Sequence, residues 1–185
     1  MRRLAKFLVT ACILAAAVIA VWQFLLKPQW ELSRYPMAFT ELVEQNAVEF
    51  GVPRELVFGV ILTESGFDPN AVSRSGAKGL MQLIDETNEW AALMMGEKAE
   101  NERIFEPELN IRRGTWLLAR LYREFGSWRE ALAAYNAGIG RVRGWLDDPA
   151  YTTDGKTLSH IPIGETRAYV DKVMKAAEKY KEIYY

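Results

Sequence analysis

The 185-residue chain has one cysteine and one histidine, and this scarcity excludes several kinds of chemistry. Cys12 has no second cysteine to pair with, so the chain cannot form an intrachain disulfide. One cysteine and one histidine do not make a zinc site of the usual kind. His160 is also the only candidate for a Ser-His relay, and it lies in a stretch that reads as a loop. The composition therefore predicts no metal site.

The chain also lacks a strong net charge. It carries 23 basic and 24 acidic residues, for a formal net charge of −1, and this balance argues against a nucleic-acid partner. The charges are unevenly distributed, because residues 1–27 contain four basic residues and no acidic one. The remainder has 19 basic against 24 acidic residues, a net charge of −5.

An apolar run from Phe7 to Leu26 is interrupted only by Thr10 and Gln23. Its length is what a bilayer-spanning helix needs. Basic residues at positions 2, 3 and 6 precede it, and the positive-inside rule then places the N-terminus in the cytoplasm and the rest of the chain outside. We expect a single-pass membrane protein with an extracytoplasmic domain.

Two other interpretations of this leader stay open. A cleaved signal peptide could end at residues 18–20, but the apolar run continues to Leu26. A lipoprotein signal could be seen at residues 9–12, but the apolar segment before Cys12 is short. An uncleaved signal-anchor fits best. We therefore expect a signal-anchor over 1–27, a short tether over 28–37 that spans at most roughly 35 Å when extended, and one domain over 38–185.

The rest of the chain reads as mostly helical, without repeats or low-complexity tracts. Apolar residues at helical spacing, together with capping and breaking residues, predict the following helices. They cover residues 40–50, 53–64, 86–95, 107–126, 128–135, 141–146 and a closing segment around 169–177. The glycine-rich residues 65–83 predict turns with at most a small β-hairpin across Ser75-Gly76. The fold class is therefore mainly α, preceded by one transmembrane helix.

Glu64 is the most informative single residue. It falls in the last turn of the helix predicted over 53–64, where the helix dipole disfavours a carboxylate. Ile61, Leu62 and Phe67 supply apolar surroundings, and both effects raise the pKa of a carboxyl group. A general acid that works near neutral pH needs such a pKa. Taken alone, the pattern also fits a solvated glutamate beside the glycine that ends the helix.

Four sequence blocks, in order, decide between these interpretations. They cover residues 64–73 (ESGFDPNAVS), 79–82 (GLMQ), 134–138 (AYNAG), and 161–162 with 165–170 (IP and ETRAYV). With these blocks the chain resembles the Slt-type lytic transglycosylases over residues 39–180. The resemblance implies an α+β lysozyme-like fold. It also implies cleavage of the β-1,4 bond between N-acetylmuramic acid and N-acetylglucosamine in peptidoglycan glycan strands, with 1,6-anhydromuramoyl ends and no cofactor.

The resemblance also implies roles for eight residues. Glu64 takes the role of the catalytic acid, and Ser65 would orient its carboxyl group by a hydrogen bond. The other six would bind the substrate, with Ser73, Met81 and Gln82 lining the saccharide groove, Tyr135 and Asn136 on the opposite wall, and Glu165 facing the glycan. Structural roles compete with these: core packing for Met81 and Tyr135, a loop hydrogen bond for Gln82, helix capping for Ser65 and Asn136, and dipole compensation for Glu165. Asp85 and Asn88 depart from the family pattern, which commonly has proline and alanine there.

The mechanism that the resemblance implies uses one carboxyl group instead of the usual two. Glu64 protonates the bridging oxygen, the substrate's 2-acetamido group relieves the charge at the anomeric carbon, and Glu64 then deprotonates the C6 hydroxyl that attacks C1. A muramidase that uses water instead stays an alternative. So do a non-catalytic peptidoglycan-binding or assembly protein and a structural membrane protein with a helical ectodomain. We expect a monomer.

Overall fold

A computed structural model describes residues 2–185; Met1, the first residue of the predicted signal-anchor, lies outside the described residues. The chain divides after Pro36 into two compact units, the second of which covers Met37–Tyr185. Each unit is described by itself.

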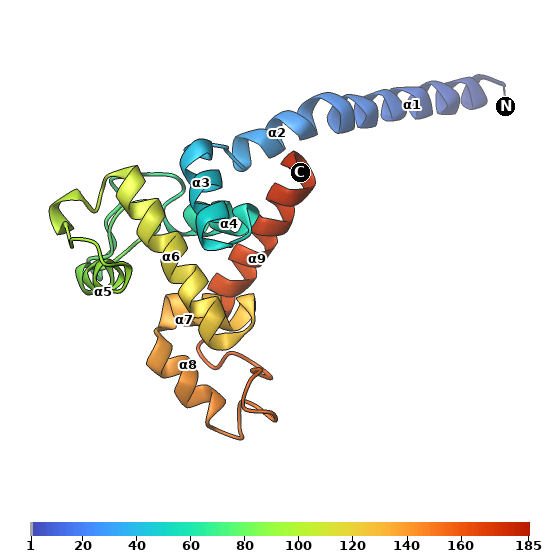
Figure 1. Ribbon diagram of the computed structural model, residues 1–185. Coiled ribbons are helices and arrows are strands. Elements are labelled where there is room, and N and C mark those ends of the chain that lie inside the picture. Colours follow the sequence, from blue (N-terminus) through green and yellow to red (C-terminus); the bar gives the residue numbers. More distant parts are fainter. Residues whose placement is uncertain (1) are drawn as a thin grey trace. The chain divides into compact units, whose positions relative to one another are not determined.

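The first unit is helical from Arg2 to Arg34. It contains α1 (Arg2–Val21), a π-helical segment η1 (Trp22–Leu26) and α2 (Lys27–Arg34) (Figure 1). Among the described residues, one helix is long and apolar enough to cross a membrane, over Ala11–Arg34, with a mean hydropathy of 1.8 in an 18-residue window. The prediction of one N-terminal helix of membrane-spanning character is thereby confirmed.

Most of the short tether expected over residues 28–37 is helical, because α2 continues the helix to Arg34. Pro28 lies in the first turn of α2, a position where proline is tolerated in helices. Lys27 and Glu31 form an ion pair at 3.8 Å one turn apart, which adds to the helix. Tyr35, with a φ of −122° and a ψ of 70°, ends the helix, so only a few residues remain as a connection.

The second unit is built from seven α-helices and one short 3₁₀ helix within the described residues. They are α3 (Thr40–Phe50), α4 (Arg54–Glu64), α5 (Asp85–Met95), η2 (Asn101–Arg103), α6 (Pro107–Phe125), α7 (Trp128–Ala137), α8 (Ile139–Leu146) and α9 (Gly164–Tyr184). Residues 2–185 contain no extended sheet, only isolated antiparallel bridges, of which Val72–Lys78 and Lys78–Leu83 lie in the predicted hairpin region. The prediction of a mainly helical domain with at most a small β-hairpin is confirmed.

Helix α4 is the centre of the second unit and packs along α9 (Figure 1). Residues 56–61 of α4 are all buried. Gly59 permits the close approach, because a Cβ atom at this position would lie 2.9 Å from the carbonyl oxygen of Val173. Phe58 stacks on Tyr180 with ring centroids 5.1 Å apart. This contact fixes where the last residue of α4 and the first turn of α9 lie.

Helix α6 holds the hairpin region in place from the other side. The buried side chain of Asn110 accepts a hydrogen bond from the Met81 backbone N–H (2.7 Å) and donates to the carbonyl oxygens of Lys78 (3.0 Å) and Ile104 (2.7 Å). The Met81 side chain is fully buried on Gly114, where a Cβ atom would come within 2.4 Å of its sulfur. Residues 78–83 are thus fastened to α6 by polar and apolar contacts together.

Candidate active site

One cavity of about 540 Å³ lies where five segments of the second unit meet. These segments are the last turn of α4, residues 73–87, α6 at Leu117, the end of α7 and the first turn of α9. Six of the eight residues that the sequence selected line it: Glu64, Ser73, Gln82, Tyr135, Asn136 and Glu165. They are up to a hundred residues apart in the chain, and the helix packing brings them together.

Glu64 is the last residue of α4 and is only partly exposed at the cavity. Burial raises its pKa from 4.5 to about 7, and an interaction with the Tyr169 hydroxyl lowers it by a smaller amount. Burial acts in this direction because it disfavours the charged form of a carboxyl group. At neutral pH a large share of the Glu64 side chains therefore carry the proton that a general acid must donate.

Two tyrosines stand close to Glu64, and the sequence analysis selected only one of them. Burial, followed by the charge of Glu64, raises the pKa of Tyr135 and of Tyr169 well above 10. The Tyr169 hydroxyl is buried and has no hydrogen bond of ordinary length and angle within the described residues. We therefore regard its interaction with Glu64 as a loose polar contact. The sequence analysis placed Tyr169 only on the apolar face of the last helix. The signal that could have identified it is that a tyrosine hydroxyl buried on such a face needs a polar partner.

A hydrogen bond joins Tyr135 to the backbone of Met81 next to the cavity. The Tyr135 hydroxyl donates a hydrogen bond of 2.7 Å to the carbonyl oxygen of Met81. Tyr135 lines the cavity, whereas the Met81 side chain packs into the core against α6. The structure therefore places the Met81 side chain in the structural role that competed with groove lining.

Ser65 lies beside the cavity without lining it. Its hydroxyl contacts the carbonyl oxygens of Leu80 (2.9 Å) and Ile61 (3.2 Å) and accepts a hydrogen bond from the Phe67 backbone N–H (3.2 Å). Among the hydrogen bonds of residues 2–185, none joins Ser65 to Glu64. The serine instead ties the end of α4 to the loop before Met81, so any effect on Glu64 is indirect.

The hairpin region presents Ser73 and Gln82 to the cavity, and both side chains also stabilise their own turns. The Ser73 hydroxyl accepts a hydrogen bond from the Ala77 backbone N–H (3.0 Å) and lies 2.9 Å from the Ser75 hydroxyl. The Gln82 amide nitrogen donates to the carbonyl oxygens of Ala71 (3.1 Å) and Gly79 (2.9 Å). Gln82 itself has a left-handed backbone, with a φ of 49°. A non-glycine residue in this region carries backbone strain, which the hydrogen bonds of the Gln82 side chain help to hold.

The opposite wall is formed by the end of α7 and the start of α9. Asn136 is exposed at the cavity, and its side-chain oxygen accepts a hydrogen bond of 2.8 Å from the Thr166 hydroxyl. Glu165 is exposed at the first turn of α9, next to Thr166. The sequence analysis did not select Thr166, because a threonine in a helix first turn carries no distinctive signal.

The two departures from the family pattern lie in the first turns of α5, next in sequence to Ile84 and Thr87, which line the cavity. Asp85 binds the Lys78 ammonium group through both carboxylate oxygens, each at 2.8 Å. Asn88 is fully buried and donates to Asn101 (2.8 Å). An ion pair thus joins the start of α5 to the hairpin region.

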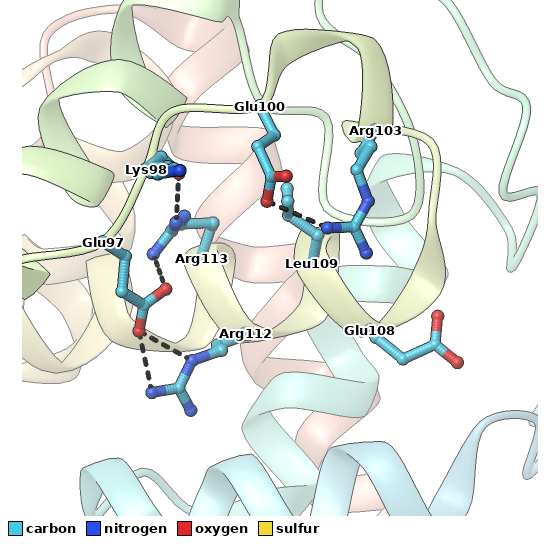
Figure 2. Close-up of a pocket in the computed structure, with 8 residues that line it drawn as sticks. All are labelled: Glu97, Lys98, Glu100, Arg103, Glu108, Leu109, Arg112 and Arg113. Atoms are coloured by element: carbon cyan, nitrogen blue, oxygen red, sulfur yellow. Dashed lines mark hydrogen bonds and ion pairs between the residues drawn. The ribbon is translucent and has the colours of Figure 1, made fainter.

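A second cavity, of about 460 Å³, lies between residues 97–103 and the first turns of α6 (Figure 2). Its arginines are paired with carboxylates: Arg113 with Glu97 (2.5 Å), Arg112 with Glu97 and Glu49 (3.1 and 2.6 Å), and Arg103 with Glu100 and Glu106 (2.9 and 2.7 Å). Because these guanidinium groups already have partners, the network serves to hold the loop on α6. No group of three or more His, Cys, Asp or Glu side chains within residues 2–185 could hold a metal ion.

Comparison with known proteins gives one consistent family. The family described as "Transglycosylase SLT domain" matches residues 41–157. The soluble lytic murein transglycosylase of Escherichia coli (strain K12) is 34% identical over 145 residues, which cover 76% of this chain and 22% of that protein. Membrane-bound lytic murein transglycosylase C of Yersinia pestis (strain Pestoides F) is 32% identical over 167 residues, which cover 77% of this chain and 46% of that protein.

Solved structures agree. An inactive glutamate-to-glutamine mutant of the lytic transglycosylase Slt from Pseudomonas aeruginosa matches with a TM-score of 0.70 and 33% identity, over 80% of this chain and 25% of that one. The 70 kDa soluble lytic transglycosylase of Escherichia coli matches with a TM-score of 0.73 and 30% identity, over 82% of this chain and 25% of that one. A structure of the 70 kDa enzyme with bulgecin A gives the same values. The chain spans less than half the length of these relatives.

Proposed function

The chain belongs to the transglycosylase SLT domain family, and from that premise we propose that it is a membrane-anchored lytic transglycosylase acting on peptidoglycan glycan strands. One observation carries the proposal: Glu64 lies at a cavity with a pKa of about 7. The names of the relatives in Escherichia coli and Yersinia support the reaction class. The mutant of the Pseudomonas relative, inactive after a glutamate-to-glutamine change, supports a role for a glutamate.

In the proposed mechanism Glu64 acts first as an acid and then as a base. Its proton passes to the oxygen that bridges N-acetylmuramic acid and N-acetylglucosamine, and the bond from that oxygen to the anomeric carbon breaks. The substrate's own 2-acetamido group stabilises the positive charge at the anomeric carbon. The Glu64 carboxylate then takes the proton of the muramoyl C6 hydroxyl, whose oxygen bonds to C1. The products are a free sugar hydroxyl and a 1,6-anhydromuramoyl end, and Glu64 is protonated again.

The surroundings of Glu64 suit both halves of this cycle. Burial favours the protonated form of Glu64, which is needed before cleavage. The Tyr169 hydroxyl lowers the pKa and so stabilises the ionised form, which is needed after cleavage. Gln82, Ser73 and Asn136 offer hydrogen-bonding groups along the cavity where a saccharide would lie. We assign these residues and Glu165 to substrate binding. Ser65 and Met81 support the site through the backbone.

The anchoring of the proposed enzyme rests on the apolar helix Ala11–Arg34. Basic residues precede the apolar run, so the protein would cross the membrane once, with its catalytic unit outside the cytoplasm. The Yersinia relative, which is named membrane-bound, supports attachment to a membrane. The partners in this proposal are the lipid bilayer and the glycan strands.

Product analysis tests the proposed reaction. The full chain, kept in detergent, is incubated with purified sacculi, and the released muropeptides are measured by mass spectrometry. A transglycosylase gives products one water mass lighter than those of a muramidase. Glu64→Gln should lower the rate at least about a hundredfold, as expected for loss of a general acid. Products that carry the added water would assign a muramidase, and binding without release would assign a non-catalytic binding protein.

A further inference from the structure

The hydrogen bond between Thr166 and Asn136 joins a buried group to an exposed one. Thr166 is 2% exposed, whereas Asn136 is exposed and lines the candidate active-site cavity. The Thr166 hydroxyl donates to the Asn136 side-chain oxygen at 2.8 Å. The two residues come from different helices, α7 and α9, and are 30 positions apart.

This contact determines which end of the amide faces the cavity. A buried hydroxyl group needs an acceptor for its hydrogen, and the Asn136 oxygen is the side-chain acceptor that the Thr166 hydroxyl has within the described residues. If the amide were turned by 180°, its nitrogen would face the hydroxyl and the buried hydrogen would lose this acceptor. The bond therefore holds the oxygen toward α9 and leaves the amide N–H groups for the cavity.

The rest of the structure keeps both partners in place. Thr166 lies in the first turn of α9. Further along, α9 packs closely on α4, where Gly59 meets the backbone of Val173 and Ala177. Asn136 precedes the end of α7, where Gly138 has a φ of 94° and stops the helix. The Asn136 amide therefore has a rigid backbone on one side and a buried anchor on the other.

We propose that Thr166 is a positioning residue, which orients the Asn136 amide so that its N–H groups donate to an acceptor oxygen of the bound glycan. The acetamido carbonyl of an N-acetylated sugar is such an acceptor, because it has no hydrogen to donate. The inference rests on the proposed function and adds a residue that does not itself line the cavity. Without the Thr166 hydroxyl, the Asn136 amide can turn either its nitrogen or its oxygen toward the cavity. An amide oxygen in that place could not form a hydrogen bond with a carbonyl oxygen of the glycan, because both are acceptors.

The test compares Thr166→Val, which keeps the shape and removes the hydroxyl, with Thr166→Ser, which restores it. Kinetics of muropeptide release from glycan strands are measured with the full chain in detergent. Thr166→Val should raise KM about twofold to tenfold, the usual value of one neutral hydrogen bond, and leave kcat within about twofold. Thr166→Ser should return KM to the parental value. Thr40→Val is the matched control, because Thr40 also donates from a helix first turn, to Met37 at 2.9 Å, away from the cavity.

A double-mutant cycle separates positioning from a general loss of structure. In the Asn136→Ala background, Thr166→Val should have no further effect on KM, because the group it orients is gone. Additive effects of the two substitutions would overturn the inference. So would a parental KM in Thr166→Val.

A spectroscopic readout keeps this test independent of the proposed activity. The side-chain amide signals of Asn136, followed by NMR without substrate, should shift in Thr166→Val and return in Thr166→Ser. Unchanged signals would overturn the inference even if the enzyme is active. If the parental chain releases no muropeptides, the proposed function fails, and the amide signals still decide whether Thr166 orients Asn136.

Discussion

Replacement of Glu64 by glutamine should stabilise the protein in alkaline solution while it slows the proposed reaction at least about a hundredfold. The side chain titrates near 4.5 in the unfolded chain and at about 7 in the folded one. Each pKa unit corresponds to about 1.4 kcal/mol. Ionisation of Glu64 in the folded state therefore lowers the free energy of unfolding by about 3 kcal/mol. Glutamine has nearly the same size and never ionises, so it does not carry this cost.

The sign of the effect follows from proton binding. Between pH 4.5 and about 7 the folded state binds the Glu64 proton more tightly than the unfolded state. The stability that this group contributes is complete below pH 4.5 and is lost as the pH rises through 7. The parental chain and Glu64→Gln should thus unfold with similar free energies at pH 4.5, and the variant should be more stable by about 3 kcal/mol at pH 8.5.

Thermal unfolding of the full chain in detergent, followed by circular dichroism at both pH values, measures this difference. For a domain of this size, 3 kcal/mol corresponds to an increase in Tm of roughly 6–12 °C. Other titrating groups are shared by the two proteins, so their contributions cancel in the comparison. Glu178→Gln, at an exposed position on α9, is the matched control and should show no such pH-dependent gain. If the Tm difference between Glu64→Gln and the parent is the same at both pH values, burial does not raise the pKa of Glu64 and the reasoning fails.

Three further predictions concern the structure around the site. Gly59→Ala should destabilise the protein by about 1–3 kcal/mol in urea unfolding, because its Cβ would lie 2.9 Å from a backbone oxygen of α9; Gly144→Ala, with no atom within 4 Å, should not. Asn110→Ala removes three hydrogen bonds and should cost about 3 kcal/mol or more; a loss below 1 kcal/mol would contradict its role in fastening the hairpin region. Tyr169→Phe removes a group that lowers the pKa of Glu64, so the alkaline limb of the pH-rate profile should move to higher pH; an unmoved limb would refute the contact.

Local sequence signals located the helices well where a helix is bounded by glycine or proline. The helix predicted over residues 40–50 has these bounds in the structure, because Gly51 adopts a left-handed backbone and stops it. The last helix starts at Gly164, one turn or more before its apolar face begins at Tyr169, since its first turn carries polar residues, of which Glu165 lines the cavity and Thr166 is buried. The sequence analysis ended the N-terminal helix at residue 27, whereas the structure continues it to Arg34, because Pro28 lies in the first turn of α2, where proline is tolerated.

The sequence by itself determined the mainly helical fold, the apolar N-terminal helix, the family resemblance and the choice of Glu64 as the candidate acid. These rest on periodicity, turn residues and motifs, which are local properties of the chain. Tertiary structure alone decided that Met81 packs in the core, that Ser65 bonds to Leu80, and that Tyr169 and Thr166 belong to the surroundings of the cavity. The physical reason is that burial and hydrogen-bond partners depend on which helices meet. That meeting is determined by contacts such as the one between α4 and α9, across more than a hundred residues of sequence.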